Sequence, residues 1–221
     1  STDVCSVAVS NDAACIFNKE DHSGPHHNET LGSFVDEALS FIDSHDLVLD
    51  AVAVSCGPGS YTGLRIGTSM AKGICYGRDV RLIAIPTLEL LAVPVLLQEL
   101  PKAEDALLVP MLDARRMEVY AQVFDRALNE IRPVQADIVT ADTYRDQLDK
   151  GPVYFFGNGA AKCMSTINHA NAHLVEGILP LAKNMFPLAE KRIAQGKYED
   201  VAYFVPFYLK DFVAKTPKKL L

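Results

Sequence analysis

The order of hydrophobic patterns is the feature that most constrains the fold, because the same order occurs twice along the chain. In the first half, the apolar runs 4–9 and 13–17 flank the turn-rich residues 10–12, which predicts a β-hairpin. Apolar residues then recur with helical spacing over 31–42, opposite a polar face. The following segments predict a strand at 51–55, a helix at 62–76, a strand at 81–85 and a helix at 87–97.

The second half repeats this order. It predicts strands at 107–113, 118–124 and 134–139, a helix at 140–148, a strand at 153–156, a helix at 160–167, a strand at 173–175 and a helix at 181–195. The polar segment 98–105 contains Pro101, so we place the boundary between two lobes there, at 1–104 and 105–221. Strands followed by alternating helices and strands in both halves predict an α/β fold with two duplicated lobes.

Composition excludes several broad classes of protein. Hydrophobic residues make up 49% and charged residues 22%, which rules out a mostly disordered chain. The net charge of −7 argues against a protein that coats nucleic acid unaided. The five cysteines are odd in number, form no C-x-x-C pair and lie among apolar residues, so we expect reduced, buried thiols. With no long apolar window and no signal peptide, we expect a cytoplasmic protein without membrane contact.

A glycine-rich loop at 55–67 joins a predicted buried strand to a predicted helix. Its glycines allow a sharp turn, and the first free N–H groups of the following helix point outwards, so Gly57, Gly59, Ser60 and Gly63 are candidates for binding a nucleotide or another anion. The loop has neither the G-K-[ST] ending of a Walker A loop nor the G-x-S-x-G pattern of a nucleophile elbow. The alternative is a tight structural turn in which Ser60 caps the helix.

The helices at 31–42 and 62–76 carry more apolar surface than one sheet needs. Small residues recur in the second helix at 63, 67 and 71 and at 73 and 77, which allows close approach of a neighbouring backbone. Packing on the lobe's own sheet is one explanation and packing on a partner helix is the other. We predict a helical bundle with a partner. Its candidate contact residues are Leu31, Phe34, Val35, Ala38, Ile66, Gly67, Met70, Gly73 and Ile74.

The chain resembles the TsaB (YeaZ) family of tRNA threonylcarbamoyladenosine biosynthesis proteins. The resemblance rests on motifs at 57–67, 85–89, 113–120, 157–160 and 206–209, which follow the family's order over nearly the whole chain. Ser1 and Thr2 resemble the end of the family's opening D-T-S-T strand, so we expect a few further residues before Ser1.

The resemblance implies a fold of the actin/sugar-kinase/Hsp70 (ASKHA, RNase H-like) type, in agreement with the duplicated pattern. It also implies a non-catalytic scaffold subunit, similar to the catalytic subunit TsaD but without its active site. Such a subunit binds and activates TsaD together with the ATPase TsaE, and the complex forms N6-threonylcarbamoyladenosine at position 37 of tRNAs that read ANN codons. Contact with tRNA is then indirect. Family members bind TsaD through the two helices described above and form a homodimer through them when TsaD is absent.

The rival functions are enzymatic: a small phosphotransferase of the ASKHA fold, or a glycoprotease-like peptidase. A phosphotransferase needs acidic metal ligands and phosphate loops in both lobes, and only one glycine loop is evident. The catalytic relative holds its metal through histidines on a helix, whereas the sequence offers His26 and His27 without a second histidine four residues on. The pair His169 and His173 lies among asparagines that favour a turn. We therefore expect no metal and no cofactor.

Two charged features have alternative interpretations. Asp113 ends an apolar strand and is either a carboxylate facing the cleft or, as we favour, a salt-bridged strand end. The tail carries Lys210, Lys215, Lys218 and Lys219, which we expect to be solvated, with contact to tRNA phosphates as the alternative.

Overall fold

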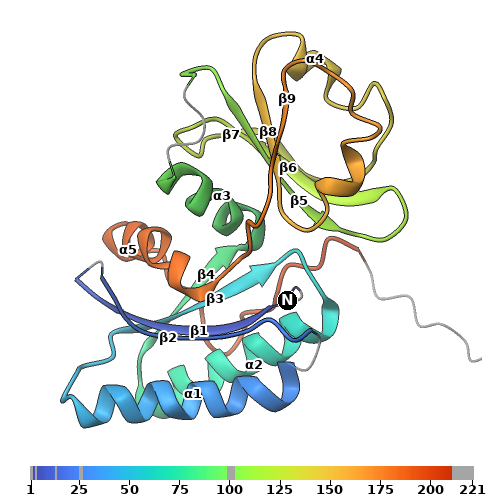
Figure 1. Ribbon diagram of the computed structural model, residues 1–221. Helices are drawn as coiled ribbons and strands as arrows, with labels where there is room; N and C mark the ends of the chain where they lie inside the picture. Colours follow the sequence, from blue (N-terminus) through green and yellow to red (C-terminus); the bar gives the residue numbers. More distant parts are fainter. Residues whose placement is uncertain (1, 3, 13, 25–26, 99–102, 211–221) are drawn as a thin grey trace, which may run out of the picture.

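The structure is a computed structural model that describes the chain except residues 1, 3, 13, 25–26, 99–102 and 211–221. The sheet of the second half lies above the strands of the first half in Figure 1, with helices between them and below. The mixed α/β arrangement confirms the predicted fold class.

The first half contains two short sheets and two long helices. Strand β1 (Cys5–Asn11) pairs antiparallel with β2 (Ala14–Asp21), which confirms the predicted hairpin. Strand β3 (Ala51–Gly57) pairs parallel with β4 (Arg81–Pro86). Helices α1 (His27–Ser44) and α2 (Tyr61–Arg78) lie side by side on the lower face in Figure 1.

The second half forms one five-stranded sheet with the order β7-β6-β5-β8-β9. Strand β5 is antiparallel to β6 and parallel to β8, and the core around it is fully buried. The strands are β5 (Leu107–Asp113), β6 (Glu118–Phe124), β7 (Glu130–Ile138), β8 (Val153–Phe156) and β9 (Ala172–Val175).

Two helices predicted in the second half are much shorter than expected. The segment 140–148 keeps only α4 (Arg145–Leu148), because Tyr144 has a left-handed backbone with φ 68° and the Thr143 hydroxyl accepts a hydrogen bond from the Thr140 N–H. The segment 160–167 keeps only the 3-10 turn η1 (Ala161–Cys163). The preceding Gly159 lies so close to the β5 backbone that an added Cβ would be 2.8 Å from the Leu112 carbonyl carbon, so packing rather than helix propensity sets this turn.

The last helix of each half lies at the junction of the two sheets. Helix α3 (Thr87–Leu97) buries Leu88 and Leu91 against Leu108 and Phe156 of the second sheet. The predicted helix 181–195 divides into the 3-10 turn η2 (Ala182–Asn184) and α5 (Phe186–Ala194), which packs against β4. The division into 1–104 and 105–221 stays a prediction. The chain after the second sheet returns to the first half, where α5 packs against β4.

The five cysteines are free thiols, but the expectation that all are buried is wrong for Cys15. It lies in β2, one strand of a two-stranded sheet, where its side chain is exposed and its thiol donates to the Phe17 carbonyl. Cys56 is the opposite case, because burial raises the pKa of its thiol to about 11. None of the described helices is long and apolar enough to cross a membrane.

Candidate partner-binding groove and glycine loop

The glycine loop is a strand-to-helix turn, as predicted. Ser60 is the N-cap of α2, and its hydroxyl accepts a hydrogen bond from the Gly63 N–H at 3.4 Å. The Ser60 carbonyl accepts from the Leu64 N–H at 2.8 Å. Gly57 has a φ of +119°, a conformation that side-chain-bearing residues rarely adopt. The tight structural turn capped by Ser60 is therefore present.

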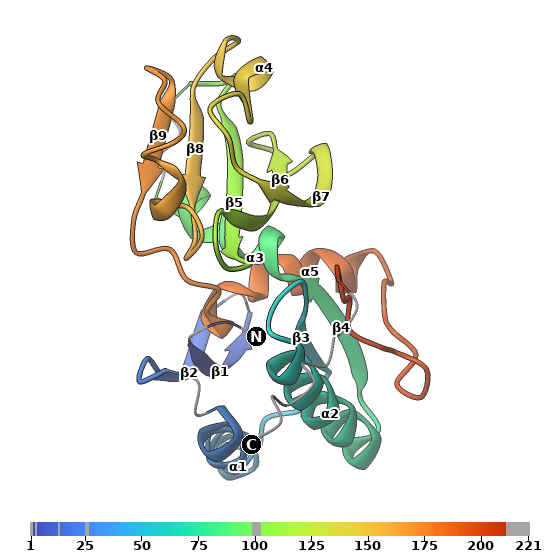
Figure 2. The same cartoon turned by 90° about the vertical axis from the view of Figure 1, so that its right-hand side faces the viewer.

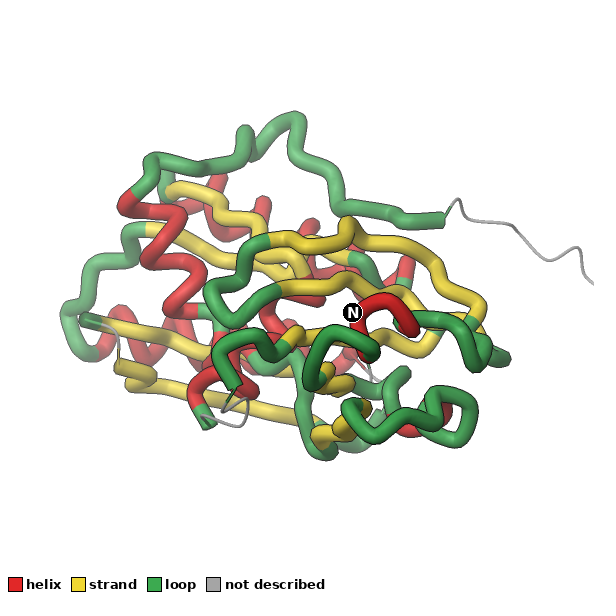
Figure 3. The backbone as a smooth tube through the Cα atoms, turned by 90° about the horizontal axis from the view of Figure 1, so that it is seen from above, coloured by secondary structure: helices red, strands yellow, loops and turns green. Residues whose placement is uncertain are grey.

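A C-terminal strap, residues 199–210, covers this loop, and sequence reasoning missed it. The Phe207 N–H donates to the Cys56 carbonyl at 2.8 Å, and a Cβ on Gly57 would lie 2.3 Å from the Phe207 carbonyl oxygen. The rings of Tyr61 and Tyr208 lie 5.0 Å apart. The strap is a long loop along one side of the molecule (Figure 3). Its sequence signals are the four aromatic residues within 203–208 and the overlapping motif at 206–209.

The side chains of Lys72 and Lys210 bind the strap to the rest of the protein at two points. The Lys72 ammonium on α2 donates to the carbonyls of Ala202 and Phe204 at 3.1 and 3.0 Å. Lys210 forms an ion pair with Glu118 of β6, so this tail lysine is paired with protein. Lys215, Lys218 and Lys219 lie outside the described residues.

The predicted anion site at Gly57, Gly59, Ser60 and Gly63 stays a prediction. The strap covers the Gly57 side of the loop, and the Ser60 side chain already satisfies the Gly63 N–H. Gly59 is half-buried and Ser60 is exposed, so they form the part of the loop that solvent reaches. Any anion therefore has fewer free donors here than the glycine pattern suggests.

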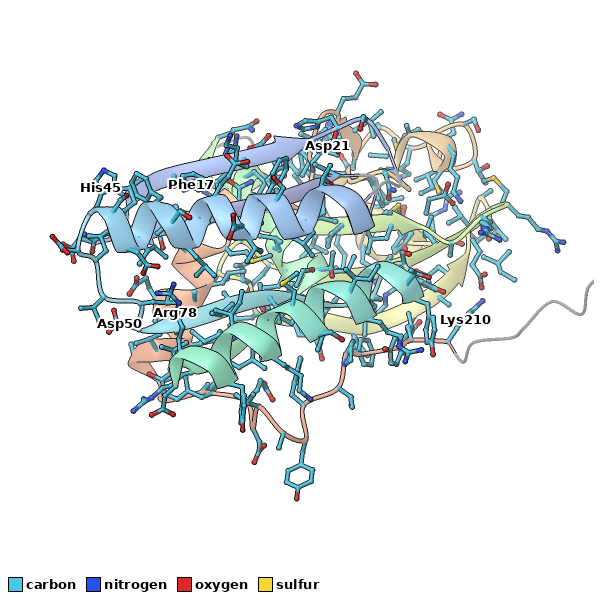
Figure 4. All side chains as sticks on the ribbon, turned by 90° about the horizontal axis from the view of Figure 1, so that it is seen from below. Phe17, Asp21, His45, Asp50, Arg78 and Lys210 are labelled. Atoms are coloured by element: carbon cyan, nitrogen blue, oxygen red, sulfur yellow. The ribbon has the colours of Figure 1, made fainter. Side chains whose placement is uncertain are left out.

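An apolar groove runs between α1 and α2 on the outer face of the first half. The two helices lie side by side when the molecule is seen from below, with Arg78 at one end of the pair and Lys210 towards the other (Figure 4). The groove has a volume of about 790 Å³. Its lining consists of Val35, Leu39, Arg65, Ile66, Ser69, Met70, Gly73, Ile74, Gly77 and Arg78.

The glycines of α2 divide between the inside and the outside of the lobe. A Cβ on Gly67 would make an ordinary contact with Val54 of β3, at 3.9 Å. A Cβ on Gly73 or Gly77 would meet nothing within 4 Å, and both residues are exposed. The inner part of the stripe therefore packs near the lobe's own sheet, whereas Gly73 and Gly77 leave backbone open to solvent.

Five of the predicted contact residues line the groove: Val35, Ile66, Met70, Gly73 and Ile74. Ala38 does not line the groove, because it is only 5% exposed and lines a separate cavity on the side of α1 that faces β1 and β3. Leu31 and Gly67 line the same cavity rather than the groove, and the half-buried Phe34 lines neither. Helical spacing identified the apolar positions, but which of them face inwards depends on how the helix is rotated against the sheet. Leu39 also lines the groove, although it was not among the predicted contact residues.

Ion pairs hold the helices in place beside the groove. The Arg78 guanidinium of α2 donates two hydrogen bonds to the Asp43 carboxylate of α1, at 2.6 and 2.7 Å. This contact keeps the pKa of Asp43 below its usual value. Lys19 of β2 forms an ion pair with Glu37 on α1 at 2.6 Å. A bidentate arginine–carboxylate pair of this kind fixes the relative position of two helix ends.

Asp113 is the salt-bridged strand end that the sequence analysis favoured, and its partner is Lys162. The Lys162 ammonium donates to the Asp113 carboxylate at 2.6 Å and to the Arg116 and Glu118 carbonyls, both at 2.7 Å. Partial burial opposes ionisation of Asp113, but the bonds from Lys162 and the Arg115 N–H, together with the positive charges of both residues, outweigh it and lower the pKa of the carboxyl group. The ion pair fixes the β5–β6 hairpin.

Among the described residues, no group of three or more His, Cys, Asp or Glu side chains could hold a metal ion. His26 lies outside the described residues, and nothing is described of the His27 side chain. His169 lies in a turn before β9, as expected, where its Nδ1 accepts from the Asn171 N–H at 3.1 Å. His173 lies in β9 with its ring 5.0 Å from that of Tyr154.

Two solved structures share this fold. A Pseudomonas aeruginosa protein described as similar to the peptidase YeaZ matches with a TM-score of 0.79 at 22% identity, over 95% of this chain and 96% of that one. YeaZ from Pseudomonas aeruginosa matches with a TM-score of 0.78 over the same shares. The molecule is thus a two-lobed α/β protein of the ASKHA type.

Sequence comparison narrows this class to a family. The family model described as "TsaD: tRNA N6-adenosine threonylcarbamoyltransferase" matches residues 21–218. The tRNA threonylcarbamoyladenosine biosynthesis protein TsaB of Bacillus subtilis is 30% identical over 73% of this chain and 70% of its own. TsaB of Escherichia coli is 28% identical over 99% of this chain and 96% of its own. The chain therefore belongs to the TsaB (YeaZ) family, whose members act in the biosynthesis of threonylcarbamoyladenosine in tRNA.

Proposed function

We propose that this protein is a non-catalytic scaffold subunit of the complex that forms N6-threonylcarbamoyladenosine at position 37 of tRNAs reading ANN codons. In this role it binds and activates the catalytic subunit TsaD together with the ATPase TsaE, and it meets tRNA only through the complex. Family membership supports the pathway, and the resemblance stated above supports the division of labour. A cytoplasmic location accompanies this role and fits the free cysteines.

The α1–α2 groove is the observation that carries the proposal. It exposes apolar side chains beside two glycines at which nothing within 4 Å would meet an added Cβ. Apolar surface of this kind, open to water, is characteristic of interaction sites in soluble proteins. A partner helix can approach the α2 backbone closely at Gly73 and Gly77 while its apolar side chains enter between Ile66, Met70 and Ile74.

The same face supports a homodimer when TsaD is absent. Two copies of α1 and α2 related by a two-fold axis would form a helical bundle in which the same patch serves both chains. A stable bundle of this type should bury about 1,000 Å² or more in total. TsaD binding and self-association then compete for one surface, so adding TsaD should dissociate the homodimer into monomers.

The experiment is the substitution Met70→Arg, with Ile138→Arg as the matched control. Met70 lines the groove, whereas Ile138 is 71% exposed at the end of β7 in the other half. An arginine in a sealed apolar interface costs several kcal/mol when it is unpaired. We expect Met70→Arg to weaken both self-association and TsaD binding at least about tenfold. Light scattering and calorimetry measure the two effects, and circular dichroism checks that both variants are folded.

The non-catalytic role has its own test. The protein alone should neither modify tRNA nor hydrolyse ATP above background, and a mixture with TsaD and TsaE should modify tRNA. Metal-dependent turnover by the isolated protein, abolished by a single substitution, would favour the phosphotransferase or peptidase. Normal TsaD binding by Met70→Arg would instead show that a different surface is the interface.

A further inference from the structure

The strap presents apolar side chains to water along one of its faces. Tyr203, Val205 and Phe207 are 84%, 71% and 43% exposed, whereas Phe204 and Pro206 between them are half-buried. An alternation of this kind is typical of an extended chain, whose successive side chains point to opposite sides. Phe204, on the inner side, packs against core residues of α2, β3 and β4. The strap therefore has one face anchored in the protein and one apolar face in water.

The outer side of α2 continues this apolar face. Figure 2 and Figure 4 both show the strap along the side of α2 that faces away from α1. Lys72 joins the helix to the strap, because its ammonium donates to the carbonyls of the residues before and after Tyr203. Tyr76 lies one helical turn beyond Lys72 and is 87% exposed. An exposed aromatic side chain of α2 thus lies close to the exposed face of the strap.

The stretches of chain that form this surface contain basic but no acidic side chains, although the whole chain has a net charge of −7. Neither 51–78 nor 201–210 contains Asp or Glu, and α2 has the cations Arg65, Lys72 and Arg78. Among the described residues, Arg78 forms an ion pair, whereas Arg65 and Lys72 have no carboxylate partner. Two cations of an acidic protein are therefore available to pair with carboxylates of another molecule.

The contacts of the strap hold its exposed side chains in place before a partner binds. The Phe207 N–H donates to the Cys56 carbonyl, Lys72 binds two further strap carbonyls, and the Tyr208 ring lies 5.0 Å from that of Tyr61. A surface with its backbone already fixed loses less conformational entropy on binding than a flexible one. Tyrosine and arginine are also enriched among the residues that contribute most to protein interfaces.

The balance of charge at this surface favours a protein partner over a nucleic acid. A nucleic acid has one phosphate per nucleotide and binds through many cations, whereas only Arg65 and Lys72 are available here. Glu199 and Asp200 lie exposed at the start of the strap and would repel a polyanion. Val205 also offers aliphatic surface rather than a ring on which a base can stack. A protein segment with one or two carboxylates beside apolar side chains matches both the charge and the apolar face.

We propose that the outer side of α2 and the strap form a second interaction surface, which binds an acidic, apolar segment of a partner protein. We call it the strap surface, and it consists of Arg65, Lys72, Tyr76, Tyr203, Val205 and Phe207. Carboxylates of the segment pair with Arg65 and Lys72, and its apolar side chains cover Tyr203 and Val205. Arg65 also lines the α1–α2 groove, so the two surfaces meet at this residue. The inference goes beyond the proposed function, because it does not depend on TsaD or on the occupant of the groove.

The test selects peptides of about twelve residues from a random library on the full 221-residue chain, since extended peptides of this length span α2. Calorimetry then compares their binding to the chain, to a variant with Tyr203→Ser and Val205→Ser, and to a control with Ile131→Ser and Ile138→Ser. The control residues are 52% and 71% exposed on β7. We expect peptides that combine Asp or Glu with Leu, Phe or Trp, and we expect the strap variant alone to bind them at least about tenfold more weakly. Replacing their carboxylates by amides, or raising the salt concentration, should also weaken binding.

Other results would overturn the proposal. If no selected peptide distinguishes the strap variant from the control, or if amides replace the carboxylates without loss, the strap surface does not bind an acidic segment. A uridine oligonucleotide that binds the chain but not the strap variant would identify RNA as the occupant, and self-association lost in that variant would identify a second copy. Circular dichroism checks folding, and the two single substitutions replace the double one if it unfolds. Met70→Arg should bind the peptides normally, so failure here is distinguishable from failure of the scaffold role.

Discussion

Substituting Gly57 by alanine tests the contact between the glycine loop and the C-terminal strap. Its φ of +119° is a conformation in which a residue with a side chain is strained by about 1–3 kcal/mol. The new Cβ would also lie 2.3 Å from the Phe207 carbonyl oxygen, a backbone atom that cannot rotate away. The strap must therefore shift, which breaks the hydrogen bond from the Phe207 N–H to the Cys56 carbonyl and costs about 1 kcal/mol more.

The expected loss is about 2–4 kcal/mol in the free energy of unfolding, which for a chain of this size lowers the melting temperature by about 10 °C. Gly24→Ala is the matched control, since Gly24 also has a positive φ, +106°, but nothing within 4 Å to meet a Cβ. The free energy of unfolding of Gly24→Ala should fall only by the contribution of backbone strain. Urea unfolding measures both changes, and limited proteolysis reports whether the strap is released. If Gly57→Ala costs no more than Gly24→Ala, the strap does not press on the loop and the reasoning is wrong.

Three further predictions concern the groove, one ion pair and the β5–β6 hairpin. Gly73→Ala should stabilise the isolated monomer by about 0.5–1 kcal/mol, because alanine is the better helix former, yet weaken self-association measured by sedimentation. Burial opposes ionisation of Glu20, but hydrogen bonds from Lys183, Asn18 and His22 together outweigh it and lower the pKa of Glu20 to about 2 from 4.5. A lowered carboxyl pKa stabilises the fold above pH 4.5, so Glu20→Gln should cost about 1 kcal/mol at neutral pH, and the difference should fade as pH falls towards 2. A constant difference across that range would contradict the assignment. Lys162→Met should destabilise the protein by about 2–3 kcal/mol in urea unfolding, since three acceptors lose their donor, and should raise the pKa of Asp113 observed by NMR.

The sequence predicted most elements of the fold because their patterns are local. The hairpin at 4–17 and the alternation of strands and helices up to 97 follow from period-two and helical spacing, and the structure confirms them. Where the prediction was wrong, a neighbouring segment decides the outcome. The helix expected at 160–167 is reduced to a 3-10 turn, next to the close contact between Gly159 and the β5 backbone. The helix expected at 140–148 is interrupted at Tyr144, whose hydroxyl donates to Asp137 on β7.

For the candidate site, the sequence by itself determined which surfaces are apolar and where the backbone can turn. The spacing of Val35, Ile66, Met70 and Ile74 already placed apolar residues along two helices, and Ser60 was identifiable as a helix cap. Only the tertiary structure decided that Ala38 faces inwards and that the strap covers Gly57. Helical periodicity gives the width of an apolar face but not its rotation against the sheet. A contact between residues 57 and 207 leaves no periodic signal, because it depends on the path of the whole intervening chain.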